Sequence, residues 1–201
     1  MNPLDKIHPS WKLIIPVLEQ KKGDLSKLDE VLQNKYYPQK EDIFNVFSMP
    51  LEDIKVVILG QDPYPKEGQA IGYSFAVSEE TPKPASLRII EQEVGHSIDK
   101  TLKSWREQGV FLLNTALTVE AGNAGSHIKY WEGFMNLVIS HISFHNPCIW
   151  VLWGKYAQGF KGAINQEGNT ILEAPHPASE AYKPGSGFIG CNHFNTINSI
   201  L

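Results

Sequence analysis

Short apolar runs that alternate with helical patterns are the feature that most limits how this chain can fold. The runs lie at 55–59 (KVVIL), 110–113 (VFLL), 148–153 (CIWVLW) and 170–173 (TILE). Continuous runs of this kind are typical of strands that are buried on both faces of a parallel sheet. We therefore expect an α/β fold, a single domain over residues 1–201, with a central, mostly parallel four-stranded sheet flanked by helices.

Helical patterns lie between and before these runs. We expect helices over 86–94, 100–107 and 131–145, the last with an apolar face at helical spacing. The first fifty residues also look helical. They contain an amphipathic stretch interrupted by Pro16, a second helix capped by Asp24, and a further turn or two over 40–47.

Composition excludes several classes of protein. The chain has 201 residues, 42% hydrophobic and 20% charged, as in globular proteins. No apolar run is long enough to cross a bilayer, and no basic region followed by an apolar stretch opens the chain, so we expect a cytoplasmic protein without a membrane partner. The two cysteines, Cys148 and Cys191, cannot build a disulfide framework, which fits a reducing compartment.

The net charge of −4, from 18 basic and 22 acidic residues, argues against binding of nucleic acid through an extended positively charged surface. Localised phosphate contacts through backbone N–H groups and hydroxyls are still compatible with it. A nucleic-acid partner therefore has to be inferred from the site.

Polar residues directly follow three of the four predicted strands. Gln61 and Asp62 come after the first strand, Asn114 after the second, and His176 is reached through Pro175 after the fourth. In open parallel sheets, ligands bind beyond the carboxyl ends of the strands. We expect an acid, an amide and an imidazole to converge on that edge.

Taken alone, each candidate also has an ordinary structural explanation. Asp62 before a proline can cap a turn, Asn114 can cap a turn or helix, and His176 can be a satisfied histidine on a rigid loop. Phe75, in GYSFAV, can be a core residue. Their joint placement is what favours function. The sequence has no P-loop, dinucleotide-binding fingerprint, nucleophile elbow or zinc-ligand spacing.

Several long motifs, in a consistent order, resemble uracil-DNA glycosylases of the Ung type. VVILGQDPYP is similar to that family's water-activating motif, GQAIGYSFAV to its stacking-phenylalanine segment, GVFLLNTALTVEAGNAGSH to its uracil-recognition strand, and APHPAS to its His-Pro loop. The likeness extends from about Trp11 to the end of the chain. The resemblance implies an enzyme that flips uracil out of DNA and hydrolyses its N-glycosidic bond, which starts base-excision repair.

The resemblance also implies a role for each residue that would contact the base. Phe75 would stack on uracil, and Asn114 would hydrogen-bond its Watson–Crick edge. Tyr64 would pack against C5, where the methyl group of thymine would clash. Gln61 would line the pocket.

For the chemistry, the resemblance implies that Asp62 orients the attacking water and stabilises the oxocarbenium-like sugar, while His176 donates a hydrogen bond to O2 of the departing uracil. Ser86 matches a serine that contacts DNA phosphate. No metal or organic cofactor is required. The implied partners are uracil-containing DNA, single- or double-stranded, and a protein inhibitor, and we expect a monomer.

Two departures from the family concern contacts with DNA. Pro65 stands where the family has a histidine, so one phosphate-contacting side chain is lost. The loop HPASEAYKPGSGF is about two residues longer than in the family, and Glu180 takes the register of the leucine wedge. We expect Tyr182 or Ala181 to act as the wedge and Ser179 to contact phosphate. These changes predict weaker DNA binding and a relative preference for single-stranded DNA.

Two other functions stay open at this stage. One is a non-catalytic DNA-binding module that keeps the fold as a scaffold, although a scaffold would not need the five residues of the implied site. The other is a glycosylase acting on a different deaminated base, although Tyr64 and Asn114 favour a pyrimidine-sized pocket.

Overall fold

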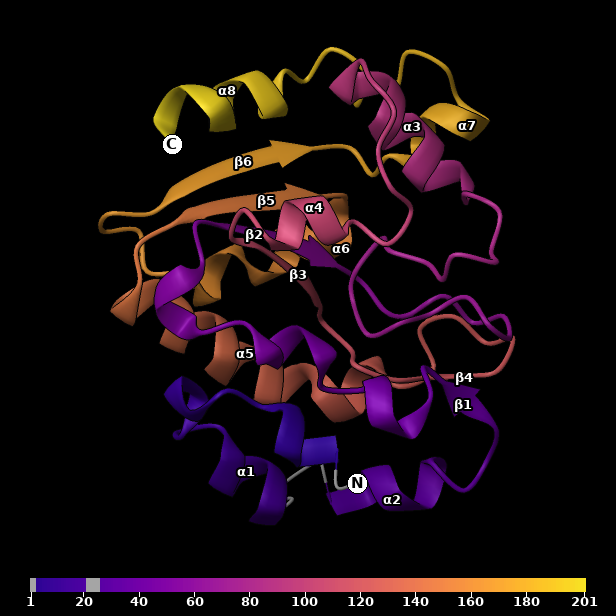
Figure 1. Ribbon diagram of the computed structural model, residues 1–201, viewed down its shortest axis with the longest axis vertical. Coiled ribbons are helices and arrows are strands. Elements are labelled where there is room, and N and C mark those ends of the chain that lie inside the picture. The colour runs from indigo at the N-terminus through magenta and orange to yellow at the C-terminus, as the bar shows by residue number, and fades with distance from the viewer. Residues whose placement is uncertain (1–2, 21–25) are drawn as a thin grey trace.

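A four-stranded parallel sheet forms the centre of the computed structural model, which describes residues 3–20 and 26–201 (Figure 1). Its strands are β2 (Val56–Gly60), β3 (Val110–Asn114), β5 (Ile149–Trp153) and β6 (Thr170–Ala174), in the order β3-β2-β5-β6. All three neighbouring pairs are parallel. The predicted α/β fold is confirmed, and so is each predicted strand to within one residue at either end.

The other elements surround this sheet. The α-helices are α1 (Ile15–Gln20), α2 (Leu28–Val31), α3 (Ala85–Val94), α4 (Lys103–Arg106), α5 (Ile128–His145), α6 (Lys155–Gln158), α7 (Ala178–Tyr182) and α8 (His193–Ile200). The 3-10 helices are η1 (Pro3–Lys6), η2 (Pro9–Trp11), η4 (Lys40–Asp42), η5 (Asn45–Ser48), η6 (Leu51–Asp53) and η7 (Gly159–Ala163). An antiparallel pair, β1 (Tyr36–Tyr37) with β4 (Val119–Glu120), was not predicted. Within the described ranges, no helix combines the length and apolarity needed to span a membrane.

Successive side chains of the strands enter two hydrophobic cores, one on each face of the sheet. Val57 and Leu59 of β2 belong to the core that also contains the buried face of α5. Val56 and Ile58 belong to the other core, which contains the buried residues of α3 and α8. Figure 1 shows α5 on one side of the sheet and α3 and α8 on the other. Burial on both faces explains the continuously apolar runs of the central strands β2 and β5, whereas the edge strand β6 is only partly buried.

Two of the three helices predicted between the strands are confirmed. Helix α3 begins one residue and α5 three residues earlier than predicted. The predicted helix over 100–107 is wrong in its length, because only Lys103–Arg106 is α-helical. The Asp99 carboxylate accepts hydrogen bonds from the backbone N–H groups of Lys103 and Ser104 and so caps the helix there. Leu102, with φ at 52°, lies outside the helical conformation.

The first fifty residues form short pieces rather than the regular helices predicted. The predicted cap Asp24 lies outside the described residues, and the segment after it is α-helical only over Leu28–Val31. Pro16 is the second residue of α1, where its missing N–H leaves no hydrogen bond unmade, so it opens this helix rather than interrupting it. Helices this short depend on tertiary packing, which the fully buried Trp11 and Ile14 supply.

Candidate functional site

The carboxyl ends of the strands surround a cavity of about 270 Å³. The structure brings together around it all of the residues predicted to act on the base, namely Gln61, Asp62, Tyr64, Phe75, Asn114 and His176. They come from separate parts of the chain: the loop after β2, the segment before α3, the last position of β3 and the loop after β6. The parallel topology is what places these distant segments at one edge.

Two glycines make room for the polar groups. Gly60 pairs in register with Asn114, and a Cβ atom at position 60 would overlap Oδ1 of that asparagine. Gly154 follows β5 with φ at +92°, and a Cβ atom there would lie 2.9 Å from Cβ of His176. The amide and the imidazole can therefore sit against bare backbone at the ends of the neighbouring strands.

Asp62 is half-buried and held by two hydrogen bonds. The backbone N–H of Gly125 donates to its Oδ2 atom at 2.6 Å, and Gln61 Nε2 donates to Oδ1 at 3.3 Å. Burial raises the pKa of the Asp62 carboxyl above its usual value, and these two bonds oppose the shift. The result is a fixed, incompletely hydrated carboxylate, which interacts strongly with a positive charge that develops beside it.

His176 is held as a neutral hydrogen-bond donor. The backbone N–H of Ala178 donates to Nδ1 of the imidazole at 3.1 Å, so this nitrogen carries no proton. Burial lowers the pKa of His176 below its usual value, which favours the neutral ring. The remaining proton therefore resides on Nε2, and the ring lines the cavity with that N–H available as a donor.

Phe75 forms an aromatic wall of the cavity. Its side chain is 8% exposed, and its ring packs edge-on against Trp153 with centroids 5.5 Å apart. The His176 ring lies 5.9 Å away on a tilted plane. The backbone of Phe75 has φ at 62°, a conformation that costs a residue with a Cβ atom about 1–2 kcal/mol. The surrounding packing holds the ring in place despite this cost.

Tyr64 forms a second rigid wall. Its hydroxyl donates to the backbone carbonyl of Phe75 at 3.3 Å and lies 2.9 Å from Ser86 Oγ. Burial raises the pKa of Tyr64 to about 12, so the phenol is neutral at physiological pH. Two hydrogen bonds at the hydroxyl fix the orientation of the ring.

Asn114 offers an amide to whatever occupies the cavity. Its side chain is 7% exposed and lines the cavity. Within the described part of the chain, its amide has no hydrogen-bond partner. The amide faces the cavity, so a ligand there that both accepts and donates a hydrogen bond can pair with it.

Of the residues predicted to contact DNA, one lines the cavity and two lie outside its lining. Ser86 lines the cavity but is only 6% exposed and is engaged with Tyr64. Ser179 and Tyr182 lie in α7, outside the cavity lining, and Tyr182 is 86% exposed. Glu180, in the register of the wedge, is buried. Their roles in binding DNA stay predictions.

Sequence reasoning missed two residues of the site. Gly125 donates the short hydrogen bond to Asp62 through its backbone, and the only signal for it was the glycine-rich stretch GNAG. Tyr73 lines the cavity two residues before Phe75, and the guanidinium of Arg106 lies 4.0 Å from the centroid of its ring. The spacing of an aromatic pair could have indicated Tyr73, whereas a backbone donor has no side-chain signature.

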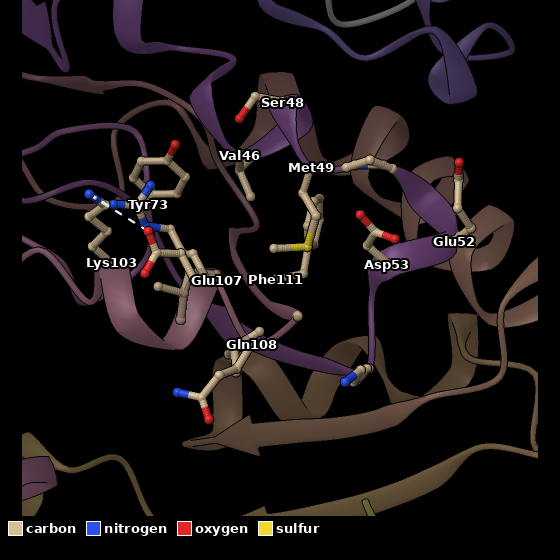
Figure 2. Close-up of a pocket in the computed structure, with 16 residues that line it drawn as sticks. Val46, Ser48, Met49, Glu52, Asp53, Tyr73, Lys103, Glu107, Gln108 and Phe111 are labelled. Atoms are coloured by element: carbon tan, nitrogen blue, oxygen red, sulfur yellow. Dashed lines mark ion pairs between the residues drawn. The ribbon is translucent and has the colours of Figure 1, made fainter.

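A second hollow, of about 560 Å³, lies at the amino ends of β2 and β3 (Figure 2). Its rim carries charges of both signs, including the ion pair of Lys103 and Glu107 at 3.6 Å. Tyr73 is the residue that lines both hollows. The larger hollow contains none of the predicted site residues, so its size does not make it the better candidate. Among the residues described, no group of three or more metal-ligating side chains occurs.

Comparison with known proteins shows which family the chain resembles throughout most of its length. Residues 48–201 match the model of the uracil DNA glycosylase superfamily. A uracil-DNA glycosylase of Psychromonas ingrahamii is 42% identical over 186 residues, 87% of this chain and 85% of that protein. One of Pseudoalteromonas translucida is 46% identical over 177 residues, 82% of this chain and 79% of that protein.

Solved structures give the same result. A variant of mimivirus UNG in complex with UGI has a TM-score of 0.89 at 28% identity and covers 100% of this chain and 87% of its own. The UNG of Nitratifractor salsuginis has a TM-score of 0.71 at 20% identity, covers 98% of this chain and 94% of its own, and shows similarity of fold alone.

Proposed function

Because the chain belongs to the uracil-DNA glycosylase superfamily, we propose that it excises uracil from DNA in base-excision repair and that the cavity at the carboxyl edge of the sheet is where it does so. The reaction is the hydrolysis of an N-glycosidic bond and leaves an abasic site. One observation carries the proposal: the acid, the amide and the imidazole, from three separate strand ends, meet beside two rigid aromatic walls around a single cavity.

The base enters this cavity by leaving the helical stack. Phe75 stacks on its face, and the amide of Asn114 donates to O4 and accepts from N3–H of uracil. Cytosine presents a donor and an acceptor in the opposite order, so it would leave buried polar groups mispaired. The unpaired state of the Asn114 amide supports this role.

Tyr64 excludes thymine. Its hydroxyl is held by Phe75 and Ser86, so the ring cannot swing aside to admit a methyl group at C5. A wall that rejects one substituent by steric overlap gives selectivity without any added attraction for uracil.

Asp62 and His176 act on the two fragments that separate. As the bond between C1′ and N1 breaks, its electron pair moves to uracil and positive charge develops on the sugar. The Asp62 carboxylate stabilises that charge and orients the water that adds to C1′. His176 donates from Nε2 to O2 of uracil, where negative charge accumulates, and its neutral state supports this role.

DNA itself is held outside the cavity. Tyr182, exposed on α7, fills the space that the flipped base leaves, and Ser86 and Ser179 contact phosphates. The net charge of −4 and the loss of a histidine at Pro65 support weak binding of the phosphate backbone. Single-stranded DNA is then the better substrate, because no base pair has to be opened.

Further partners follow from the same proposal. Two of the similar mimivirus structures are complexes with UGI, and this chain binds a protein inhibitor of that kind over its site. All residues assigned to the base come from one chain, which supports activity as a monomer. The cytoplasm is its place of action.

The test is release of the base from oligonucleotides that contain uracil, thymine, cytosine or hypoxanthine at one position. The wild type should release uracil alone, and Asp62→Asn should release it about a hundred- to a thousandfold more slowly. If the wild type leaves uracil in place, the chain is a DNA-binding scaffold rather than an enzyme. Release of hypoxanthine in preference to uracil would instead assign it to another deaminated base.

A further inference from the structure

Glu180 binds a loop of its own chain. Its side chain is 6% exposed and accepts hydrogen bonds from several backbone N–H groups of the segment that follows α7. Oε2 accepts from Gly185 at 2.8 Å. Oε1 accepts from Gly187 at 2.9 Å, from Phe188 at 2.8 Å and from Ile189 at 3.2 Å. A segment that would otherwise hydrogen-bond to water is thus closed around one carboxylate.

This carboxylate is ionised in the folded protein. Burial disfavours the charged form, but the backbone donors outweigh it and hold the pKa of Glu180 at about 2. Successive N–H groups that point at an anion form a site of the kind that usually binds phosphate. Here the protein's own side chain occupies it, so the negative charge is shielded from the phosphates of DNA.

The segment that Glu180 closes is anchored beside the base cavity. Gly185 and Gly187 have φ at 78° and 100°, which lets the backbone curve around the carboxylate. Phe188 is fully buried and packs edge-on against Trp153, with centroids 5.1 Å apart. Trp153 in turn contacts Phe75. The loop is therefore attached to the packing that supports the stacking ring.

Tyr182 lies between Glu180 and the loop that Glu180 closes. It is the last residue of α7, a helix of five residues, and 86% of it is exposed. A helix of this length is not stable on its own. Glu180 lies before Tyr182 in the chain and the loop that it closes begins after it, so the segment that carries the tyrosine is held at both ends, while α7 itself packs against α3.

We propose that Glu180 is a positioning residue for double-stranded DNA: by closing the loop over 185–189, it holds Tyr182 in the orientation that fills the gap left by the flipped base. This inference rests on the proposed function and on the assignment of Tyr182 as the wedge. It also explains why a glutamate can stand at the position where the family has its leucine wedge: the Glu180 side chain is buried in the protein and does not face DNA.

The test compares uracil excision from a duplex and from the same strand alone, using Glu180→Gln. The side-chain oxygen of the glutamine can keep the three hydrogen bonds that Oε1 now accepts. Its NH2 group replaces Oε2 and cannot accept from the N–H of Gly185, so that hydrogen bond is lost. The variant therefore loosens the side of the loop nearest Tyr182 and spares the rest. The ratio of duplex to single-strand kcat/KM should fall about tenfold, mostly through KM for the duplex.

Glu93→Gln is the matched control. Glu93 also accepts backbone hydrogen bonds, from Gly190 at 2.6 Å and Asn192 at 2.9 Å, in the adjoining segment beyond the closed loop. Its substitution weakens the same kind of contact and leaves all four hydrogen bonds to Glu180 in place. The ratio should stay within about twofold of the wild type.

A double-mutant cycle separates positioning from stability. Tyr182→Ala should lower the ratio about tenfold, and Glu180→Gln combined with it should lower it no further, because the tyrosine that Glu180 positions is gone. The inference would be overturned if the double variant lowered the ratio by the product of the two single effects. It would also be overturned if Glu180→Gln slowed excision from both substrates equally. An unchanged ratio in Tyr182→Ala would overturn it as well. A wild type that releases no uracil from either substrate would instead overturn the proposed function on which it rests.

Discussion

The base cavity and the segment over 178–189, which comprises α7 and the loop that Glu180 closes, lie side by side but are built differently. The cavity is formed by strand ends, bare glycines and buried rings, and its polar groups point to where a base would sit. The segment consists of a short helix followed by a glycine-rich loop, and the backbone N–H groups of that loop donate hydrogen bonds to the carboxylate of Glu180 in the helix. The cavity has every residue that the family resemblance assigns to the base and departs from the family's motif only at Pro65, whereas the loop departs from it in both length and sequence.

The two regions differ in which functions a substitution can change. Groups at strand ends are held by the whole sheet, so a substitution there disturbs the chemistry itself. A surface loop that closes on its own carboxylate can vary in length and sequence while the cavity stays intact. Changes in the cavity should affect single- and double-stranded DNA alike, and changes in the loop should affect the duplex.

Among the variants that test this difference, His176→Leu is expected to change the rate of uracil release most. The substitution removes the Nε2–H donor and keeps an apolar side chain of similar bulk. Single-turnover release of uracil should fall about a hundred- to a thousandfold, equally on both forms of DNA. A loss confined to the duplex would move His176 from the chemistry to DNA binding.

A smaller effect is expected for Gly60→Ala. The new methyl group would overlap Oδ1 of Asn114 and Cβ of the buried Ser74, and the amide would be displaced. Displacement of about 1 Å at a reacting site can cost a hundredfold, so kcat/KM should fall about ten- to a hundredfold on both substrates. Gly133→Ala, in helix α5 with no heavy atom within 4 Å of the added methyl, is the control and should leave the rate unchanged. Equal rates for the two variants would contradict the account of Asn114.

The smallest effect is expected for Pro65→His, in the cavity lining after Tyr64. It restores the residue with which the family's motif ends, and with it a phosphate contact. KM should fall about threefold at low salt, and binding should become more dependent on salt, while kcat stays the same. A change in kcat instead would show that Pro65, which lines the cavity, affects the chemistry there rather than the binding of DNA.

The fold and the cavity could be predicted from the sequence for one physical reason. Apolar runs mark buried parallel strands, and the polar residues directly after them mark their carboxyl edge, as Asp62, Asn114 and His176 show. Both signals are local, and the topology then brings them together.

What could not be predicted depends on backbone groups that are distant in sequence or carry no side-chain pattern. The N–H of Gly125 reaches Asp62 from 63 residues away. The inward turn of Glu180 depends on four N–H groups of a loop whose conformation the sequence does not reveal. Likewise, the late start of α4 follows from the side chain of Asp99, which competes with a longer helix.

The central claim is that Asp62, as a carboxylate, drives excision within the cavity. The most direct measurement is the single-turnover rate of uracil release from single-stranded DNA between about pH 4 and about pH 8, for the wild type and Asp62→Asn. Because burial raises the pKa of Asp62 above 3.8, the wild-type rate should rise with pH along an acid limb centred above that value. Asp62→Asn should be about a hundred- to a thousandfold slower at neutral pH and should lack this limb. An Asp62→Asn enzyme that works at the wild-type rate, or that shows the same limb, would contradict the account.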